Sequence, residues 1–321
     1  MKIVIAGGTG LLGRVLTRKF RRDGHSVLVL SRNVESPGVL WDGKTLGGWT
    51  EIVDGADVLV NLAGRHVNTR YDAKTRAEIM SSRVDSTRVL GQAVARAANP
   101  PKVWLQASTA TIYSHRFDAP NDEYTGILGG FEPDAPKEWH FSTDVARAWE
   151  QAIDEADTPH TRRVKMRMAV VMTLGRGSAF ELMLRHVRLG FGRMGDGKQY
   201  ISWLHEEDFT RAVDWLIEHD IEGPVNLASP NPLPNGEFMH VLHQAWGMPL
   251  SIPSVRPILD VGAFLMRTEL ELVLKSRRVV PARLLEHGFS FNYSRWQDAA
   301  RDLVAQVRGE KACGTQPSPV W

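Results

Sequence analysis

Apolar and polar positions change their period repeatedly along the first half of the chain. Short apolar runs, typical of buried strands, are followed by stretches in which apolar residues recur every three or four positions, the spacing of an amphipathic helix. The first such pair is the run 2–6 and the helical pattern from Leu11 to Arg22, which gathers Val15, Leu16 and Phe20 on one face. This alternation predicts an α/β fold with a parallel, doubly wound sheet.

The same patterns predict the later elements. Strands are expected at 27–30, 57–64, 103–107, 164–172 and 225–228, and helices at 72–98, with a break or bend near its start, at 139–156 and at 205–219. The segment 113–139 is rich in Gly, Pro and Asp and has no clear period, which is typical of functional or mobile loops. The glycines of 190–197 indicate a surface turn, because no helix start follows them. After a turn cluster at 230–234 the pattern is mostly helical up to Arg308.

Glycines at positions 7, 10 and 13 stand between the first predicted strand and the first predicted helix. In a dinucleotide-binding turn the first glycine permits a sharp turn, the second lets the backbone approach a pyrophosphate, and the third lets the helix pack closely. Backbone N–H groups and the positive end of the helix dipole then meet at one point. A P-loop is excluded, since no Gly-Lys-Ser/Thr follows. We expect cofactor contacts here from Gly7, Thr9, Gly10, Leu11, Leu12 and Gly13.

The tip of the second predicted strand bears on the choice of dinucleotide. In a Rossmann unit an acid at this point binds the ribose 2′-hydroxyl of NAD, whereas an arginine accommodates the 2′-phosphate of NADP. Here the tip reads Ser31-Arg32-Asn33, and the first acid after it is Glu35. Solvated arginines are common after strands, but the spacing from the glycines favours Arg32 as a ligand of the 2′-phosphate, with a hydroxyl contact from Ser31. The expected cofactor is NADP(H).

Composition excludes several other classes of protein. With 321 residues, 43% hydrophobic and 24% charged, the chain is typical of a globular protein. A net charge of +2 implies no polyanionic partner such as a nucleic acid. Cys313 is the single cysteine, so a disulfide framework is excluded. The chain has no long apolar run and starts on a predicted core strand, so we expect a cytoplasmic protein with no membrane contact. The histidines near position 240 lack a zinc-binding pattern, so no metal is expected.

Several motifs together are similar to a known superfamily. They are the glycine turn, Asn61-Leu62-Ala63-Gly64, Ser108-Thr109-Ala110-Thr111-Ile112-Tyr113, and Trp203-Leu204-His205-Glu206-Glu207-Asp208. These resemble segments of the extended and atypical short-chain dehydrogenases/reductases. More narrowly, further segments resemble the NAD(P)-dependent epimerase-like family, described as nucleoside-diphosphate-sugar epimerases, which carries a C-terminal domain of unknown function. Those segments are Ser82-Arg83, Trp149-Glu150, Gly223-Pro224-Val225-Asn226, Val273-Leu274, Arg277-Arg278-Val279-Val280-Pro281 and Leu284-Leu285-Glu286-His287-Gly288-Phe289.

The resemblance implies a Rossmann-type core with a smaller, mostly helical C-terminal substrate lobe. We expect the NADP(H)-binding domain at 1–174, with 200–228 returning to it, the substrate lobe at 175–199 and 229–308, and a tail at 309–321. The resemblance further implies that Leu62, Ala63 and Gly64 line the cofactor site. Arg83 is at a position where sugar-nucleotide enzymes often place an asparagine near the cofactor. It is expected to contact cofactor or substrate phosphate, the alternative being a charge on a helix surface.

The catalytic dyad of the superfamily, Tyr-x-x-x-Lys, is absent. In that dyad the lysine lowers the pKa of the tyrosine, which then transfers a proton while hydride moves to or from nicotinamide. The five tyrosines are Tyr71, Tyr113, Tyr124, Tyr200 and Tyr293, and none has a lysine four residues later. Counted back from Trp149-Glu150, the dyad positions fall near Phe141 or Ser142 and near Val145 or Ala146.

Candidates for the chemistry remain at the end of the fourth predicted strand and in the loop after it. Thr109 stands at the catalytic Ser/Thr position of the superfamily, although a strand-end threonine bonding backbone is an equal alternative. Tyr113, together with His115, Asp118, Tyr124 and Glu132 of the loop, offers replacement acids or bases.

Two functions fit these observations. The first is an NADP(H)-dependent oxidoreductase or epimerase-like enzyme that acts on a small-molecule substrate, such as a sugar nucleotide or a carbonyl compound. The second is a non-catalytic NADPH-binding module for redox sensing or interaction. The missing dyad favours the second, while a C-terminal lobe that would cap the nicotinamide end favours the first.

Overall fold

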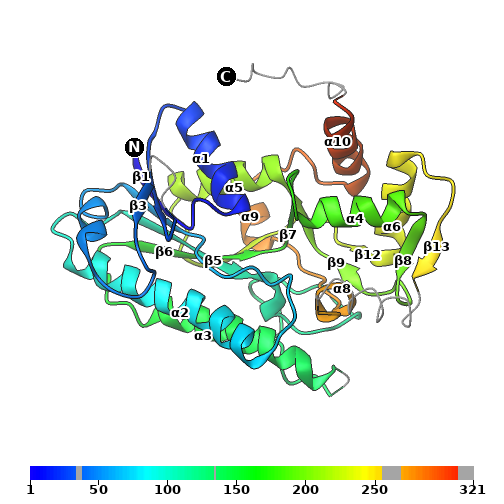
Figure 1. Cartoon of the computed structure of the whole chain (residues 1–321), viewed down its shortest axis with the longest axis horizontal. Helices are drawn as coiled ribbons and strands as arrows, with labels where there is room; N and C mark the ends of the chain where they lie inside the picture. The colour runs from blue at the N-terminus through cyan, green and yellow to red at the C-terminus, as the bar shows by residue number, and fades with distance from the viewer. Residues whose placement is uncertain (34–37, 134, 255–268, 310–321) are drawn as a thin grey trace.

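The protein is built around a seven-stranded parallel sheet, seen in the computed structural model (Figure 1). The structure describes residues 1–33, 38–133, 135–254 and 269–309. The strand order is β11-β6-β5-β4-β1-β2-β3, so the chain reverses direction across the sheet beside β1. The strands are β1 (Lys2–Ala6), β2 (Ser26–Ser31), β3 (Gly38–Leu40), β4 (Val58–Asn61), β5 (Val103–Thr109), β6 (Arg162–Met168) and β11 (Gly223–Leu227). The predicted Rossmann-type α/β fold is confirmed.

Helices cover both faces of this sheet (Figure 1). One face carries α1 (Leu11–Arg22) and α5 (Glu206–Glu218), and the other carries α2 (Ala73–Arg96) and α3 (His140–Asp154). Each face buries its own apolar cluster. The first contains Leu16, Phe20 and Phe209, and the second contains Leu90, Trp104 and Ile153. Burial of the sheet on both faces explains why its strands read as continuous apolar runs.

The expected break near the start of the helix at 72–98 was wrong. Asp72 caps α2 by accepting a hydrogen bond from the backbone N–H of Thr75 at 2.7 Å, and the helix is continuous from Ala73 to Arg96. The capping carboxylate satisfies an N–H group that has no partner within the helix, which lets the helix begin sharply.

A second group of elements lies beside the sheet, toward the right of Figure 1. Its helices are α4 (Ala179–Arg188), α6 (Asn235–Trp246) and α10 (Trp296–Arg308). Three short strand pairs accompany them: β7 (Val170–Met172) with β10 (Trp203–His205), β8 (Phe191–Met194) with β13 (Ile252–Ser254), and β9 (Tyr200–Ile201) with β12 (Leu233–Pro234). Large side chains such as Phe180, Trp203, Phe238 and Trp296 form their common apolar core.

Short helical segments complete the described chain. They are the 3₁₀ helices η1 (Gly48–Ile52), η2 (Ala110–Ile112) and η3 (Lys137–Trp139), and the α-helices α8 (Glu271–Leu274) and α9 (Ala282–Glu286). No helix within the described ranges is long and apolar enough to span a membrane. Apart from Gly309, the expected tail at 309–321 lies outside the described residues.

Two sequence predictions in this region were wrong. The single strand expected at 164–172 is two strands, because the chain leaves the large sheet at Ala169 and β7 then pairs with β10. The surface turn expected at 190–197 contains β8, which pairs with β13. Both pairings join segments far apart in the sequence, so the local pattern does not reveal them.

Candidate functional site

The glycine turn after β1 is tightly packed against two neighbouring segments. Gly7 has a φ of +76°, and a Cβ atom on it would lie 2.8 Å from the carbonyl group of Leu62 and the backbone N of Ala63. A Cβ atom on Gly13 would lie 2.5 Å from the Gly7 carbonyl oxygen. Both positions therefore require glycine, and the turn after β4 lies directly against the turn after β1.

The N-terminus of α1 is left open by this turn. Gly10 is the exposed N-cap residue and has no side chain with which to bond the first helical N–H groups. The first intrahelical bond runs from the Arg14 N–H to the Gly10 carbonyl at 2.9 Å. The N–H groups of Leu11 and Leu12 precede it and have no acceptor within the helix. Such groups, with the helix dipole behind them, form an anion site.

A side-chain contact joins this turn to the end of β2. The hydroxyl oxygens of Thr9 and Ser31 are 3.1 Å apart, and Ser31 is buried. The first turn and the tip of β2 are thus held side by side, as a cofactor that spans both would require.

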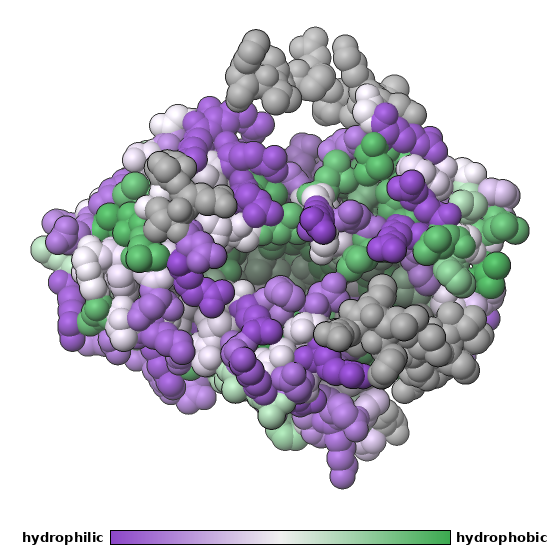
Figure 2. Space-filling view, viewed as in Figure 1, coloured by the Kyte–Doolittle hydropathy of each residue, from purple (hydrophilic) through white to green (hydrophobic). Residues whose placement is uncertain are grey.

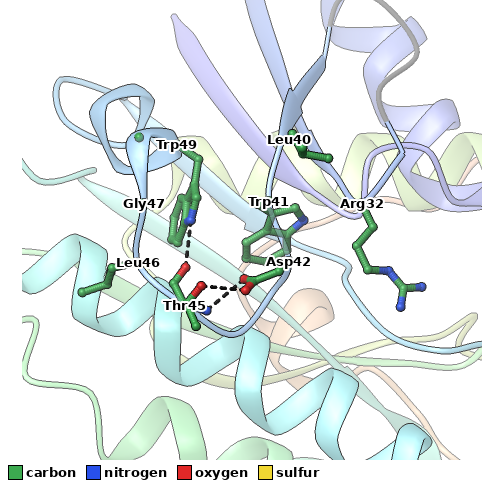
Figure 3. Close-up of a pocket in the computed structure, with 9 residues that line it drawn as sticks. Arg32, Leu40, Trp41, Asp42, Thr45, Leu46, Gly47 and Trp49 are labelled. Atoms are coloured by element: carbon green, nitrogen blue, oxygen red, sulfur yellow. Dashed lines mark hydrogen bonds between the residues drawn. The ribbon is translucent and has the colours of Figure 1, made fainter.

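Arg32 borders a pocket of about 480 Å³ beside the tip of β2 (Figure 3). Figure 3 shows Arg32 on one side of the pocket, with Trp41 and Asp42 next to it and Thr45, Leu46 and Trp49 opposite. Among the described residues none pairs with the Arg32 guanidinium. The carboxylate of Asp42 already accepts hydrogen bonds from the N–H and hydroxyl groups of Thr45, at 2.9 and 2.6 Å. These bonds lower the pKa of Asp42 to about 2. Arg32 therefore has no charge partner among the described residues, and it borders a largely apolar pocket.

The turn after β4 is fixed by the buried side chain of Asn61. Its amide nitrogen donates to Gln106 Oε1 at 3.0 Å, and its amide oxygen accepts from the Ala63 N–H at 3.0 Å. An asparagine has both a donor and an acceptor to offer, so it can hold the turn and the neighbouring strand at once. This fixes Leu62, Ala63 and Gly64 beside Gly7.

Arg83 of α2 lies against the same turn. A Cβ atom on Gly64 would lie 3.2 Å from the Arg83 guanidinium carbon, which stacks 5.0 Å from the Trp149 ring. The guanidinium donates to the Ile79 carbonyl at 3.1 Å, and no described carboxylate pairs with it. Burial lowers the pKa of Arg83 to about 10. A half-buried cation with spare N–H groups beside the turn after β4 is what an anionic ligand would need.

Thr109 and Tyr113, the two catalytic candidates, are in different environments. Thr109 is partly buried at the end of β5, and its hydroxyl oxygen accepts the Thr111 N–H at 3.1 Å. Its hydroxyl proton bonds to no acceptor among the described residues. Tyr113 is 2% exposed, and its hydroxyl donates to Asn226 at 3.0 Å and accepts from Arg167 at 2.9 Å. Thr109 is thus free to donate a hydrogen bond, whereas the bonds of Tyr113 fit a structural role better than a catalytic one.

The expected dyad positions on α3 are occupied by other residues. Phe141 packs edge-on against Tyr71 with the ring centres 5.5 Å apart, and Ser142 donates to the carboxylate of Glu271 at 2.6 Å. Val145 and Ala146 are buried apolar residues. Neither position of the superfamily's dyad carries a titratable side chain.

Four tyrosines, Tyr71, Tyr113, Tyr124 and Tyr293, have raised pKa values. Burial, with a contribution from Glu271, raises the pKa of Tyr71 to about 12. Burial also raises the pKa values of Tyr113 and Tyr293. A hydrogen bond to Glu286 raises the pKa of the exposed Tyr124. A tyrosine with a raised pKa stays protonated at neutral pH and cannot accept a proton.

The other candidates in the loop 113–139 are engaged in local contacts. Asp118 pairs with Arg116, and His115 Nδ1 accepts the Ser276 N–H at 2.8 Å. Glu132 accepts the N–H groups of His115 and Gly130, at 2.7 and 2.6 Å. Burial alone would raise the pKa of Glu132, but these backbone bonds lower it overall. The sequence could not show these uses, since each depends on how the loop folds.

Sequence reasoning missed a cluster of ionisable, largely buried side chains beside the end of β5. It comprises Tyr71, Glu271, Lys275 and Arg277. Lys275 and Glu271 are 3% and 4% exposed. Arg277 belongs to a motif that carried the family resemblance, but no local pattern marks the other three as buried.

A hollow lies at the centre of the molecular face shown in Figure 2, with apolar residues on its floor. It separates the sheet side of the molecule from the side that carries α4 and α6. In open α/β sheets, ligands bind outside the carboxyl ends of the strands, where the strand order reverses.

Two family models match the sequence. The NAD dependent epimerase/dehydratase family matches residues 3–136, and a domain of unknown function, DUF1731, matches 258–303. The bovine epimerase family protein SDR39U1 is 30% identical over 312 residues, which cover 95% of this chain and 100% of the relative. This chain belongs to the epimerase family. The family prediction is thereby confirmed, including its C-terminal domain of unknown function.

Further members of the epimerase family match over almost their full length. The protein YfhF of Bacillus subtilis is 30% identical, over 95% of this chain and 98% of YfhF. The crystal structure of human SDR39U1 (isoform 2) with NADPH superposes with a TM-score of 0.82 at 27% identity, covering 95% of this chain and 99% of that one. A UDP-N-acetylglucosamine 4-epimerase from Bacillus cereus shares the fold, with a TM-score of 0.74 at 19% identity and coverage of 96% and 100%.

Proposed function

We propose that this epimerase-family protein binds NADP(H) at the carboxyl edge of the sheet and transfers hydride between it and a small molecule. The enzyme would be an oxidoreductase or epimerase-like enzyme that works without the Tyr-x-x-x-Lys dyad. The observation that carries this proposal is Arg32, a cation that pairs with no described residue and borders the pocket at the tip of β2.

The described residues fit NADPH along its length. The open N-terminus of α1, with Gly10, Leu11 and Leu12, would bind the pyrophosphate. Arg32 would pair with the 2′-phosphate, and the pocket between Arg32 and Trp49 would accept part of the adenosine. The human relative crystallised with NADPH supports this choice of cofactor.

The nicotinamide end would lie near Leu62, Ala63, Gly64 and Thr109. When bound, NADPH supplies a hydride to an electrophilic carbon of the substrate. Thr109 would donate its free hydroxyl proton to a substrate oxygen, and Arg83 would pair with a phosphate of the cofactor or substrate. The segments 175–199 and 229–308 would form the substrate lobe. The substrate class that fits is a small carbonyl compound or a sugar nucleotide.

Titration of NADPH and NADH tests the cofactor proposal. A hydrogen bond to a charged group contributes about 1.5–3 kcal/mol, so wild type should bind NADPH roughly ten- to a hundredfold more tightly than NADH. Arg32→Ala should remove this preference and leave NADH affinity unchanged. Arg22→Ala, which removes an exposed arginine of α1, should keep it. Equal affinities in wild type, or an unchanged ratio in Arg32→Ala, would contradict the proposal.

A second function, a non-catalytic NADPH-binding module, is favoured by the lack of a titratable side chain at the dyad positions of α3, near Phe141 or Ser142 and near Val145 or Ala146. Screening NADPH oxidation with carbonyl compounds, quinones and sugar nucleotides distinguishes the two functions. Tight NADPH binding without turnover on the whole panel would favour the second function.

A further inference from the structure

Three ionisable side chains of the C-terminal region converge beside the end of β5. Glu271 belongs to α8, and Lys275 and Arg277 follow it. The side chains of Lys275 and Glu271 are almost completely buried, and their Nζ and Oε1 atoms are 3.9 Å apart. Burial of two charges carries a large free-energy penalty, which close pairing must offset. A separation beyond hydrogen-bond length therefore needs an explanation.

Thr111 connects this cluster to the proposed substrate site. Its N–H donates to Thr109 Oγ1 at 3.1 Å, and its carbonyl accepts from Lys275 Nζ at 3.0 Å. Its own hydroxyl oxygen accepts from Arg277 Nε at 3.0 Å. The Lys275 ammonium and the Thr109 hydroxyl thus both bond to the backbone of Thr111, the first at its carbonyl and the second at its N–H.

Glu271 joins the cluster to the dyad position on α3. Ser142 donates its hydroxyl proton to Glu271 Oε2 at 2.6 Å. The other oxygen, Oε1, is buried and accepts no hydrogen bond from any described residue. Lys275 has three N–H donors, of which the Thr111 carbonyl uses one. No described residue accepts from its other N–H groups, and a substrate oxygen would accept from one of them.

We infer that Lys275 is the proton donor and acceptor for the reaction and replaces the missing dyad from the C-terminal domain, with Glu271 and Ser142 as positioning residues. This inference rests on the proposed NADP(H)-dependent function, and its substrate is a small carbonyl compound or the corresponding alcohol. In reduction, the Lys275 ammonium gives a proton to the carbonyl oxygen while hydride from the reduced nicotinamide reaches the carbonyl carbon. The products are the alcohol, NADP⁺ and a neutral Lys275 amine, which regains a proton from water.

The electrostatic surroundings of Lys275 suit this role. Burial and the neighbouring Arg277 lower the pKa of Lys275 to about 8, against the opposing effect of Glu271. Glu132 also raises this pKa, and Arg147 of α3 lowers it further. A proton carrier works best when its pKa is near the working pH. An ordinary lysine, with a pKa of about 10.4, would hold its proton too tightly to serve in both directions.

Reductive methylation tests the inference without any substrate. Formaldehyde with cyanoborohydride modifies neutral amines, and mass spectrometry locates the modified lysines. We expect Lys275 to react with a midpoint near pH 8, about two units below an exposed lysine, and at least tenfold more slowly with saturating NADPH. Glu271→Gln should lower this midpoint by about one unit, because a negative charge beside the ammonium is lost.

Two variants complete the test. In Lys275→Met the methylation that has a midpoint near pH 8 should disappear, while the affinity for NADPH should be unchanged. The rate of reduction of any carbonyl substrate should fall about 10²–10⁴-fold. Lys198→Met, which removes an exposed lysine, should leave all three properties unchanged. Circular dichroism confirms that both variants fold.

The outcomes separate this inference from the proposed function. Binding of NADPH to a protein whose Lys275 is unmodified up to pH 9, or is modified equally fast with and without NADPH, would overturn the role of Lys275 and leave the cofactor proposal standing. Failure of the wild type to bind NADPH would overturn the proposed function and this inference with it.

Discussion

At the scale of single residues, the three glycines of the first turn are constrained by different contacts. Gly7 and Gly13 are surrounded by backbone atoms, so a side chain at either position would disturb the turn itself. Gly10 differs, because it is exposed and its φ of −68° suits any residue. The nearest atom to a Cβ at Gly10 is the Gly7 carbonyl oxygen at 3.2 Å. The space in front of Gly10 is where the pyrophosphate is proposed to bind.

Gly10→Val should therefore abolish cofactor binding and leave the fold largely intact. The branched side chain would occupy the space of the pyrophosphate, while the Gly7 carbonyl, 3.2 Å from the added Cβ atom, needs to shift only slightly. Calorimetry with NADPH measures binding, and circular dichroism measures the fold. Gly10→Ala should give an intermediate loss of affinity. A folded Gly10→Val variant that binds NADPH at wild-type strength would show that the turn has another role.

At the scale of secondary-structure elements, a buried polar network joins the strands β5, β6 and β11 to the helix α3. Arg167 of β6 forms a double hydrogen bond with Glu150 of α3, at 2.8 and 2.7 Å, and also donates to Tyr113. Ser108 of β5 donates to the same carboxylate at 2.6 Å. Asn226 of β11 accepts from Tyr113. The Trp149-Glu150 and Gly223–Asn226 motifs of the family are thus explained in part by this network.

Arg167→Met should lower the free energy of unfolding by about 3–5 kcal/mol, because it leaves the Glu150 carboxylate buried without its cation. Urea denaturation measures the change. Lys165→Met, on the same strand, removes an ion pair with the largely exposed Asp154 and should cost less than about 1 kcal/mol. Equal losses for the two variants would mean that the network contributes little.

The same scale explains what the sequence could and could not predict. The strands β1, β2, β4 and β5 were predictable, because a buried parallel strand carries its signal in its own apolar residues. The pairing of β8 with β13 was not, because it depends on a contact between distant segments. Lys275 was missed for the same reason, since its hydrogen bond to the Thr111 carbonyl joins residues 164 positions apart. The candidate cofactor residues lie mostly on short turns whose local sequence predicts them. The cluster of Glu271, Lys275 and Arg277 forms its contacts only when distant segments of the chain have folded together.

At the scale of the whole molecule, the chemistry would be divided between the sheet and the C-terminal domain. The turns that follow the sheet strands would bind the cofactor, and Thr109 at the end of β5 would bond to the substrate. The segment after α8 would supply Lys275 as the proton carrier. The Asp208 carboxylate of α5 helps to anchor the C-terminal chain by accepting the N–H groups of Asn292 and Tyr293, both at 2.8 Å. The 203–208 motif, which ends at Asp208, thus has a structural role here.

This division predicts that no single tyrosine is the catalytic base. With any substrate that the panel reveals, Tyr113→Phe and Tyr124→Phe should keep turnover within a few-fold of wild type. Thr109→Ala should lower it about 10–100-fold, since a hydrogen bond of about 1.5–3 kcal/mol to the developing charge is lost. NADPH oxidation followed by absorbance measures these rates. Fast turnover that disappears with one tyrosine alone would refute the prediction, because that residue would then be an activated base.

The most direct test of the account is a crystal structure of the protein with NADP⁺ bound. We expect the Arg32 guanidinium to lie about 2.7–2.9 Å from an oxygen of the 2′-phosphate, and the pyrophosphate to lie at the N–H groups of Leu11 and Leu12. The nicotinamide C4 should face the space between Thr109 and Lys275. A 2′-phosphate that makes no contact with Arg32, or a nicotinamide ring directed away from the end of β5, would contradict the account.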